Sequence, residues 1–464
     1  MRILRQYVSN RELVFILGEG LLIFGAVFLA SSFFGLPRMS LFERLLVIWP
    51  KALLVAFVAQ FSLYFNDLYE IRVSESTLDL ATHLIQAIGM TSVTLAVIYF
   101  VWPEAIIGRW VFFLSLVFLI GFLVSWRLLY NVAIRRRMFT SKTLIVGAGE
   151  LAGDLLKAVN QRKDLSYDIR GILYHPGETP VIGEDQGIPI RLGFDGLCDL
   201  AEAEEASSII VALDDKRGIM PYHELLSCKV RGLSVIDGES FYERITGKLL
   251  VEKINPGWLI FSEGFRKSAF SRFLKRLAGL VMATVMLILL SPVMVLVAVA
   301  IKLDSRGRVI FSQERVGENG GIFMLHKFRS MRADAEEATG PVWAAEDDPR
   351  VTRVGRIIRK LRIDELPQLW NILNGEMSFV GPRPERPFFV ERLRRTVPYY
   401  EERFTVKPGL TGWAQVMYAY GATEEDALEK LRYDLYYIKN MSLVLDLIVI
   451  FHTVKIVLLG RGSR

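Results

Sequence analysis

Cysteine is scarce in this chain of 464 residues, which contains only Cys198 and Cys228. The two lie far apart in the sequence and neither belongs to a Cys-x-x-Cys pair, so we expect neither a disulfide framework nor a metal site built from cysteine. The chain also has only five histidines, and none stands at metal-ligand spacing from another. The scarcity of cysteine further predicts that the soluble parts face a reducing compartment.

Apolar residues, by contrast, are abundant. Hydrophobic residues make up 52% of the chain and its mean hydropathy is +0.32, more than a soluble globular protein of this size requires. This composition excludes a simple soluble enzyme and a disordered regulator. The net charge of +6 is modest, but the basic surplus lies mainly from Arg266 to the end. We therefore expect an anionic ligand or a membrane surface there, and no nucleic-acid partner.

The first 140 residues contain four apolar stretches, each long enough to cross roughly 30 Å of hydrocarbon as a helix. They run from about 13 to 34, 45 to 64, 83 to 102 and 110 to 126. Arginines precede the first stretch and follow the fourth, whereas the expected outer loops contain few cations, so both ends should be cytoplasmic. Glu19 and Lys51 lie within the first two stretches, where they are either functional or simply paired.

Residues 141–254 have the composition of a soluble α/β domain. A buried strand at 143–146 leads into the glycine turn Gly147-Ala-Gly149 and then into a helical pattern, which is typical of a dinucleotide fold. However, the acidic residue that would bind the ribose is missing after the second strand, where the sequence reads Tyr174-His175-Pro176. We therefore expect a Rossmann-like domain without cofactor-binding residues, used for assembly or regulation, and keep nucleotide binding as the alternative.

A further apolar stretch extends over residues 277–301 and carries Ser291 and Pro292 near its middle. By length it would be a fifth span, which would place everything after it outside the cell. A proline inside a helix removes an N–H group and kinks the helix. Either a re-entrant helix that enters and leaves by one face or a bent spanning helix would satisfy this pattern. The chemistry that follows in the chain favours the re-entrant helix.

The last apolar stretch, residues 441–459, is interrupted by three polar side chains, Asp446, His452 and Lys455. Charged groups are costly at the centre of a bilayer. The stretch is therefore expected to be an interfacial or packed helix and not a span.

Asp364 and Glu365 are the residues that we expect to carry the chemistry. Pro367 is tolerated only in the first turn of a helix, which predicts that a helix begins near Asp364 and brings its positive end to both carboxylates. One carboxylate can then attack a phosphorus atom while the other binds Mg²⁺. An isolated Asp-Glu pair before a helix is usually an N-terminal cap, but the basic and glycine-proline clusters around this one favour catalysis.

Two arginines are placed to hold the charge of a diphosphate. Arg359 precedes Asp364 by five residues, and Arg383 lies in a Gly-Pro-Arg-Pro turn whose prolines restrict the backbone. For Lys360 and Arg362 we expect a solvated or headgroup-facing helix surface. The turn at 381–384 and the Lys-Pro-Gly-Leu-Thr-Gly-Trp segment at 407–413 could alternatively be only rigid turns.

With these residues in view, the sequence from about Phe270 onward resembles the bacterial sugar transferases of the monotopic phosphoglycosyl transferase family. These are polyprenyl-phosphate sugar-1-phosphate transferases that initiate exopolysaccharide and O-antigen synthesis. The resemblance rests on motifs in the family's order: Lys275-Arg276, Ser291-Pro292, Lys-Phe-Arg-Ser-Met at 327–331, Asp-Glu-Leu-Pro-Gln-Leu at 364–369, and the segments 381–384 and 407–413. The large form of the family has three parts, matched here by a four-helix transmembrane region (1–140), the Rossmann-like domain (141–254) and a monotopic catalytic domain (255–464).

The resemblance implies a fold that is membrane α plus α/β, with a re-entrant helix at about 277–301 broken at Ser291-Pro292. It implies that Asp364 is the nucleophile and Glu365 a ligand of Mg²⁺. Arg359, Arg383 and Lys327 are then contacts to the phosphates or the nucleotide of the substrate.

The implied reaction is a ping-pong transfer at the bacterial inner membrane, with the catalytic domain in the cytoplasm. A UDP-sugar gives its sugar-1-phosphate to Asp364 and releases UMP, and polyprenyl phosphate then accepts the group. The extra domains lead us to expect a homo-oligomer, a dimer. Two alternatives stay open: a membrane-bound nucleotide sensor or assembly protein without catalysis, and a glycosyltransferase that moves only the sugar and releases UDP.

The sequence departs from the family at two places. The family commonly has an aspartate shortly after the Lys-Arg pair, where this chain has Ala278-Gly279, and it often reads Gly-Pro-Val where this chain has Gly307-Arg308-Val309. Neither departure touches Asp364 or Glu365. The first leaves open how the helix at 277–301 is anchored.

Overall fold

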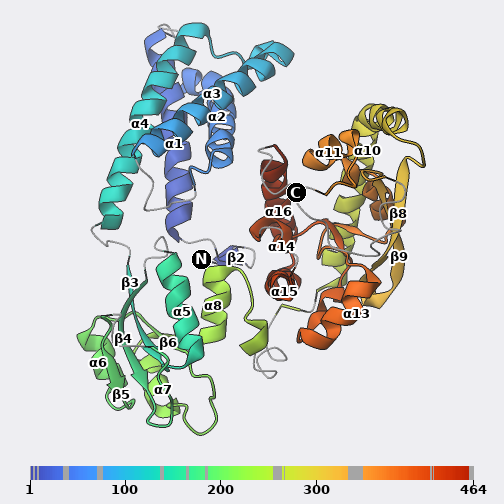
Figure 1. Cartoon of the computed structure of the whole chain (residues 1–464). Helices are drawn as coiled ribbons and strands as arrows, with labels where there is room; N and C mark the ends of the chain where they lie inside the picture. Colours follow the sequence, from blue (N-terminus) through green and yellow to red (C-terminus); the bar gives the residue numbers. More distant parts are fainter. Residues whose placement is uncertain are drawn as a thin grey trace. The chain divides into compact units, whose positions relative to one another are not determined.

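The computed structural model describes residues 2–3, 6–7, 10–34, 41–69, 77–135, 140–162, 167–182, 187–253, 264–265, 267–332, 348–418, 421 and 423–458. The chain divides into two compact units (Figure 1). The first comprises Met1–Ile3 and Tyr7–Ile236, and the second Leu4–Gln6 and Asp237–Arg464. The first unit contains a helical bundle and a sheet with its own core. The second unit contains the sequence motifs from Lys275 onward.

The bundle of the first unit consists of four long apolar helices, α1 (Asn10–Phe34), α2 (Leu41–Phe65), α3 (Thr77–Val101) and α4 (Arg109–Arg135). Shorter elements of this region are β1 (Arg2–Ile3), β2 (Gln6–Tyr7) and η1 (Pro103–Ala105). Small and aliphatic side chains such as Ala26, Ala52 and Leu123 fill the space between the helices, while many large apolar side chains point outward. Each helix is long and apolar enough to cross a membrane, as expected from the sequence.

The two charges predicted within the bundle have protein partners. Glu19 is fully buried and its Oε1 lies 2.9 Å from Nη2 of Arg127, whose other amino group donates to the carbonyl oxygen of Leu68. Lys51 donates a hydrogen bond of 2.9 Å to the carbonyl oxygen of Ile106 and lines a cavity of about 300 Å³. Pairing therefore accounts for Glu19, in keeping with the simpler of the two expectations.

A five-stranded sheet follows the bundle, with the strand order β5-β4-β3-β6-β7. Numbered from β3, this is the order 3-2-1-4-5 of a doubly wound dinucleotide fold. The pairs of β3 with β4 and β6, and of β4 with β5, are parallel. The strands are β3 (Ser141–Val146), β4 (Tyr167–Tyr174), β5 (Ile190–Leu192), β6 (Ser208–Val211) and β7 (Ser234–Asp237), and the helices are α5 (Glu150–Gln161), α6 (Leu197–Ala203) and α7 (Tyr222–Val230).

The two cysteines correct one expectation from the sequence. Cys198 on α6 and Cys228 on α7 form a disulfide, although 30 residues separate them. Both are buried in the core of the sheet domain, where the two helices pack side by side. The prediction that the chain forms no disulfide was wrong because sequence spacing does not reveal which helices become neighbours.

The second unit is built around a buried cluster rich in aromatic side chains, among them Tyr400, Phe404, Trp413 and Tyr437. Two short sheets border it, the antiparallel pair β8–β9 and the parallel pair β10–β11. Its elements are α8 (Gly238–Thr246), η4 (Val251–Lys253), α10 (Ala269–Asp304), β8 (Ile310–Val316), η5 (Glu318–Gly320), β9 (Ile322–Phe328), α11 (Arg353–Lys360), η6 (Ile363–Glu365), α12 (Gln368–Asn374), β10 (Ser378–Val380), α13 (Pro387–Thr396), η7 (Tyr400–Thr405), β11 (Gly409–Thr411), α14 (Trp413–Met417), α15 (Glu424–Asn440) and α16 (Leu443–Leu458).

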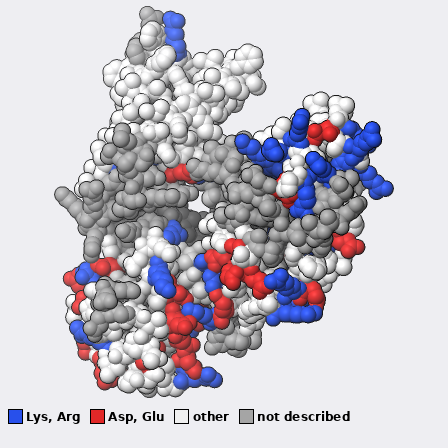
Figure 2. Space-filling model, viewed as in Figure 1, with Lys and Arg blue, Asp and Glu red and all other residues white. Residues whose placement is uncertain are grey.

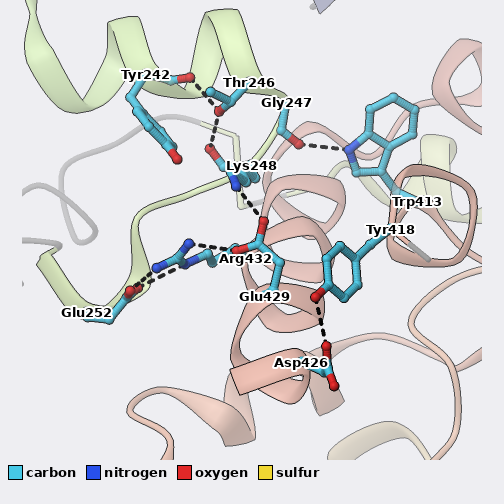
Figure 3. Close-up of polar contacts among 10 residues, drawn as sticks. All are labelled: Tyr242, Thr246, Gly247, Lys248, Glu252, Trp413, Tyr418, Asp426, Glu429 and Arg432. Atoms are coloured by element: carbon cyan, nitrogen blue, oxygen red, sulfur yellow. Dashed lines mark hydrogen bonds and ion pairs between the residues drawn. The ribbon is translucent and has the colours of Figure 1, made fainter. Parts of the chain in front are cut away.

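The segment that begins the second unit is held on α14 and α15 by polar contacts (Figure 3). The indole Nε1 of Trp413 donates to the carbonyl oxygen of Gly247 at 2.8 Å. Lys248 pairs with Glu429, and Arg432 donates to Glu252. Although the sequence analysis assigned residues up to 254 to the α/β domain, these contacts place the segment from Asp237 with the second unit.

Helix α10 is the long apolar helix of the second unit, and its N-terminal part is anchored by the Lys-Arg pair. Nζ of Lys275 lies 2.6 Å from Oδ2 of Asp446 and donates to the carbonyl oxygen of Val380 at 3.0 Å. Arg276 donates to two carbonyl groups at the end of α12, one of them that of Leu373 at 2.8 Å. These contacts anchor the helix in a chain that has Ala278 where the family commonly has aspartate.

The C-terminal part of α10 is bound to the same unit. Oδ2 of Asp304 accepts a hydrogen bond from the amide of Val354, and the buried Arg329 donates to the carbonyl oxygen of Ser305 at 2.8 Å. Between the two anchored parts, Ser291 and Pro292 are exposed. If straight, the 36 residues of α10 would form a helix about 54 Å long, longer than the roughly 30 Å of membrane hydrocarbon.

Helix α16 confirms the expectation of a packed helix. Leu445 and Val449 are fully buried in the main core, and Asp446 is the partner of Lys275. Lys455 is also buried. Two of the polar residues that interrupt this apolar segment, Asp446 and Lys455, are therefore enclosed within the unit.

Candidate active site

Asp364 and Glu365 lie in the 3₁₀ turn η6, between α11 and α12. Arg362 before the turn has a φ of 56°, which reverses the chain after α11. Helix α12 begins only at Gln368, with Pro367 at its N-cap. The prediction of a helix starting near Asp364 thus needs correction, because the two carboxylates precede the helix. The left-handed backbone of Arg362 lies just after α11, too close to Asp364 for the next α-helix to begin there.

Three cations from different parts of the chain surround the Glu365 carboxylate. Its Oε1 lies 3.3 Å from Nζ of Lys327, 3.1 Å from Nη2 of Arg383 and 3.7 Å from Nη1 of Arg362. Glu365 is 8% exposed and Asp364 is 7% exposed, so water screens these charges weakly. The structure therefore brings Lys327 and Arg383, which the resemblance implies to be substrate contacts, next to the predicted pair.

Burial and charge move the pKa values of the two carboxyl groups in opposite directions. Burial raises the pKa of Asp364, and the neighbouring Glu365 charge raises it further. Burial acts on Glu365 in the same sense, but Lys327, Arg383 and Arg362 together hold its pKa below the ordinary value. Glu365 is therefore the more readily ionised member of the pair, and Asp364 is the more basic carboxyl group.

Lys327 reaches the site from strand β9, which Asn371 holds against α12. Oδ1 of Asn371 accepts from the amide of His326 at 3.1 Å, and its Nδ2 donates to the carbonyl oxygen of Met324 at 2.7 Å and to Glu376. Asn371 is fully buried. It couples the strand that carries the lysine to the helix that follows the carboxylates, a role that no local sequence pattern indicated.

Arg383 is positioned by close backbone packing and by a buried arginine. A Cβ atom at Gly381 would lie 2.5 Å from the carbonyl oxygen of Lys407, so glycine lets the segments 381–384 and 407–413 approach. Strands β10 and β11 join the two segments in parallel. Nη2 of Arg403 donates to the carbonyl oxygen of Arg383 at 3.0 Å and pairs with Asp434 at 2.9 Å. The turn is thus a built support for Arg383 and not only a rigid loop.

Arg359 and Arg362 differ from the roles expected for them, because it is Arg362 that contacts the Glu365 carboxylate. The Nε of Arg359 donates to Oγ of Ser330 at 3.0 Å, and its charge acts on Asp364 without contacting Glu365. Arg362, which was expected on a solvated or headgroup-facing surface, instead faces Glu365. The spacing of three residues between Arg362 and Glu365 was the signal for this contact.

Basic side chains also gather on the surface of this unit. Figure 2 shows Lys and Arg concentrated over the part that carries α11 and the end of α10. The exposed cations of these segments are Lys302, Arg306, Arg308, Arg353, Arg356 and Lys360. Their positive potential attracts anionic substrates and anionic membrane surfaces.

The donor atoms at the site suit a magnesium ion shared with a substrate. The part of the chain that the structure describes contains no group of three His, Cys, Asp or Glu side chains able to hold a metal. Mg²⁺ is usually bound through one or two carboxylates together with substrate phosphates. Glu365 offers such a carboxylate, with Asp364 beside it, and the positive charges of Lys327 and Arg383 next to it suit phosphate oxygens.

Comparison with known proteins bears on both units. Residues 270–460 match the bacterial sugar transferase family model, and residues 64–218 match the model of a CoA-binding domain. An undecaprenyl-phosphate glucose phosphotransferase of Komagataeibacter xylinus is 32% identical over 373 residues, covering 78% of this chain and 68% of that protein. The chain belongs to the bacterial sugar transferase family.

Two further relatives share this family. A UDP-glucose:undecaprenyl-phosphate glucose-1-phosphate transferase of Escherichia coli (strain K12) is 34% identical over 323 residues, covering 68% of this chain and 67% of the relative. A UDP-N-acetylgalactosamine-undecaprenyl-phosphate N-acetylgalactosaminephosphotransferase of Aeromonas hydrophila is 42% identical over 240 residues, covering 52% of this chain and 56% of the relative. The resemblance based on the motifs is therefore confirmed, and with it the assignment to a class of membrane transferases.

Proposed function

We propose that this protein transfers a sugar-1-phosphate from a UDP-sugar to polyprenyl phosphate, the undecaprenyl form in bacteria. The products are polyprenyl diphosphate sugar and UMP, and the reaction is the first step of exopolysaccharide or O-antigen synthesis. The observation that carries the proposal is the buried Asp364–Glu365 pair with Lys327, Arg383 and Arg362 around it. The names of the relatives, which pair undecaprenyl phosphate with UDP-sugars, supply the substrates.

In the first step, a carboxylate oxygen of Asp364 attacks the phosphorus atom that bears the sugar. The new O–P bond forms as the bond between this phosphorus and the bridging oxygen of the diphosphate breaks, and UMP leaves with that oxygen. The raised pKa of Asp364 makes it the better nucleophile of the pair. An aspartyl phosphosugar results, which divides one difficult transfer into two easier steps.

In the second step, a phosphate oxygen of polyprenyl phosphate attacks the same phosphorus. The O–P bond to Asp364 breaks, and the carboxylate is restored as the diphosphate of the lipid product forms. Arg383, Lys327 and Arg359 bind the phosphate oxygens in both steps, where charge spreads over the equatorial oxygens. A module seated at the headgroup layer lets a soluble anionic donor meet an amphipathic anionic acceptor.

We assign Glu365 as the protein ligand of Mg²⁺, together with oxygens of the substrate diphosphate. When bound, the ion neutralises the charge that develops on the leaving phosphate. Lys327 and Arg383 hold Glu365 ionised and oriented before the substrate enters. In the absence of substrate, Lys327 and Arg383 neutralise the charge of the Glu365 carboxylate. A bound diphosphate would add the negative charge needed for Mg²⁺ to bind beside these cations.

The proposal also includes the way in which the catalytic unit associates with the membrane. We infer that α10 is a re-entrant helix broken at Ser291-Pro292, since both of its ends bind the same unit while its middle is exposed. With such a helix, the catalytic unit would lie at the cytoplasmic face of the bacterial inner membrane, as the proposed substrates require. A dimer of the full chain is part of the same proposal.

The test is an assay of membranes that contain the protein with a panel of UDP-sugars and undecaprenyl phosphate. We expect UMP release that depends on one of the donors and the appearance of lipid-linked sugar diphosphate. Release of UDP would instead favour a glycosyltransferase that moves only the sugar. Membranes with Asp364→Asn serve as the control, and mass spectrometry of wild type trapped with donor alone should find the sugar phosphate on residue 364.

A further inference from the structure

The glycine turn of the sheet domain is occupied by a side chain of the protein itself. In a dinucleotide fold, the N-terminal end of the helix after the first strand binds the pyrophosphate through free N–H groups. Here that helix is α5, and the carboxylate of Asp214 lies at its end. Oδ2 accepts from the amide of Glu150 at 2.8 Å, and Oδ1 accepts from the amide of Leu151 at 2.9 Å.

Gly149 makes this contact possible. A Cβ atom at position 149 would lie 2.0 Å from Oδ2 of Asp214, so any other residue would push the carboxylate away. The second glycine of a dinucleotide-binding turn normally lets the backbone approach the pyrophosphate. In this chain the same glycine admits a carboxylate from the loop after β6.

Gly147 brings that loop to the turn. Its φ is +115°, and a Cβ atom there would lie 2.4 Å from the carbonyl oxygen of Ala212. The amide of Ala212 in turn donates to the carbonyl oxygen of Val146 at 2.7 Å. Ala212, which follows β6 and stands two residues before Asp214, is therefore held against the turn by main-chain contacts.

The rest of the turn is also unsuited to a nucleotide. The amide of Val181 donates to the carbonyl oxygen of Ala148 at 2.9 Å, so the chain after β4 crosses the turn. Oε2 of Glu178 accepts from the amide of His175 at 3.0 Å, and burial together with the charge of Asp214 raises the pKa of Glu178. Glu150 adds a further acidic residue in the first turn of α5. These charges oppose the binding of anionic phosphates.

These residues therefore do not fit coenzyme A, although residues 64–218 match the model of a CoA-binding domain. We propose that Asp214 is a built-in occupant of the anion site at α5. In the native protein the domain then binds neither coenzyme A nor a dinucleotide, and the site accepts a phosphate group only when the Asp214 side chain is removed.

The experiment is hydrogen exchange followed by mass spectrometry on the full chain in nanodiscs, which reports on the peptide at 147–156 independently of turnover. In Asp214→Ala the amides of Glu150 and Leu151 lose their acceptors, and we expect the peptide to exchange about 2- to 30-fold faster than in wild type. Inorganic pyrophosphate should restore its protection. Asp214→Asn keeps one acceptor oxygen and should give an intermediate rate.

Asp215→Ala is the matched control, because Asp215 is the neighbouring exposed carboxylate and pairs with the exposed Arg217. Its peptide should exchange as in wild type, with or without pyrophosphate. Protection of the wild-type turn by coenzyme A or NAD would overturn the proposal. An unchanged exchange rate in Asp214→Ala, or no response of that variant to pyrophosphate, would overturn it as well. Because none of these readouts requires catalysis, failure here is distinct from failure of the proposed transferase activity.

Discussion

Arg403 donates a hydrogen bond of 3.0 Å from Nη2 to the main-chain carbonyl oxygen of Arg383. The same guanidinium pairs with Asp434 at 2.9 Å, and both members of this pair are buried. The arginine that contacts Glu365 therefore rests on a second arginine whose charge is balanced within the core. We therefore expect changes at Arg403 to affect both activity and stability.

We predict that Arg403→Ala lowers the free energy of unfolding of the catalytic unit by about 3–5 kcal/mol, because it leaves Asp434 buried without its cation. Denaturant unfolding of the unit measures this. Arg403→Lys keeps the positive charge but loses the guanidinium group, whose planar geometry lets one side chain contact both Asp434 and the carbonyl oxygen of Arg383. It should raise the KM for the UDP-sugar more than it lowers kcat, since Arg383 is then less well placed. An equal effect of both variants on stability with no change in KM would contradict this role.

We predict that Asp364→Asn and Glu365→Gln each lower turnover by orders of magnitude while expression and membrane insertion stay intact. The first removes the nucleophile, and the second removes the ionised carboxylate that faces Lys327 and Arg383. UMP release from membranes measures turnover. Glu318→Gln, which alters an exposed turn residue, is the control and should behave as wild type. Full activity of Asp364→Asn would rule out the covalent mechanism.

The pH dependence of turnover should report the carboxylate pair. Asp364 must be ionised to attack, so activity falls on the acidic side as the pair takes up a proton. Lys327 lowers the pKa of both carboxyl groups, so Lys327→Met should move this acidic limb to higher pH. Glu365→Gln removes a neighbouring negative charge and should move the limb of its residual activity to lower pH. Arg395→Gln, at an exposed ion pair with Glu391, is the control with no shift.

Removal of divalent cations should abolish turnover. The carboxylate of Glu365 is the expected protein ligand, and oxygens of the substrate diphosphate would complete the site. Treatment with EDTA should therefore stop UMP release, and added Mg²⁺ should restore it. Wild-type turnover in excess EDTA would count against a role for the metal and leave Lys327 and Arg383 as the groups that balance the charge.

The membrane topology of α10 can be tested with cysteines placed on both sides of its proline. Ser271→Cys and Ser305→Cys lie on either side of Ser291-Pro292 within one helix and its C-cap. A re-entrant helix predicts that a membrane-impermeant thiol reagent modifies both only from the cytoplasm. Modification of either one from the periplasm would show that the helix spans the bilayer. The buried cysteines of the native disulfide should not react with the reagent.

Much of the site followed from local sequence. Adjacent carboxylates with basic and glycine-proline motifs around them pointed to Asp364, Glu365 and Arg383, and the family resemblance added Lys327. The structure brings all four together. The start of the following helix was misplaced, because Pro367 is compatible both with a first turn and with the N-cap that it occupies. Arg362 was misassigned because its αL backbone, which turns it toward Glu365, depends on how α11 ends.

The sequence by itself determined which segments are apolar enough to enter a membrane, and it identified the adjacent carboxylates of the candidate site. Both properties depend on neighbours along the chain, through helix length, hydropathy and the limits that proline sets on the backbone. Only the tertiary structure decided which side chains meet: the Cys198–Cys228 disulfide, the support of Arg383 by Arg403, and the occupation of the α5 anion site by Asp214. These contacts join residues 20 to 64 positions apart, and packing of whole elements, which no local pattern encodes, brings them within bonding distance.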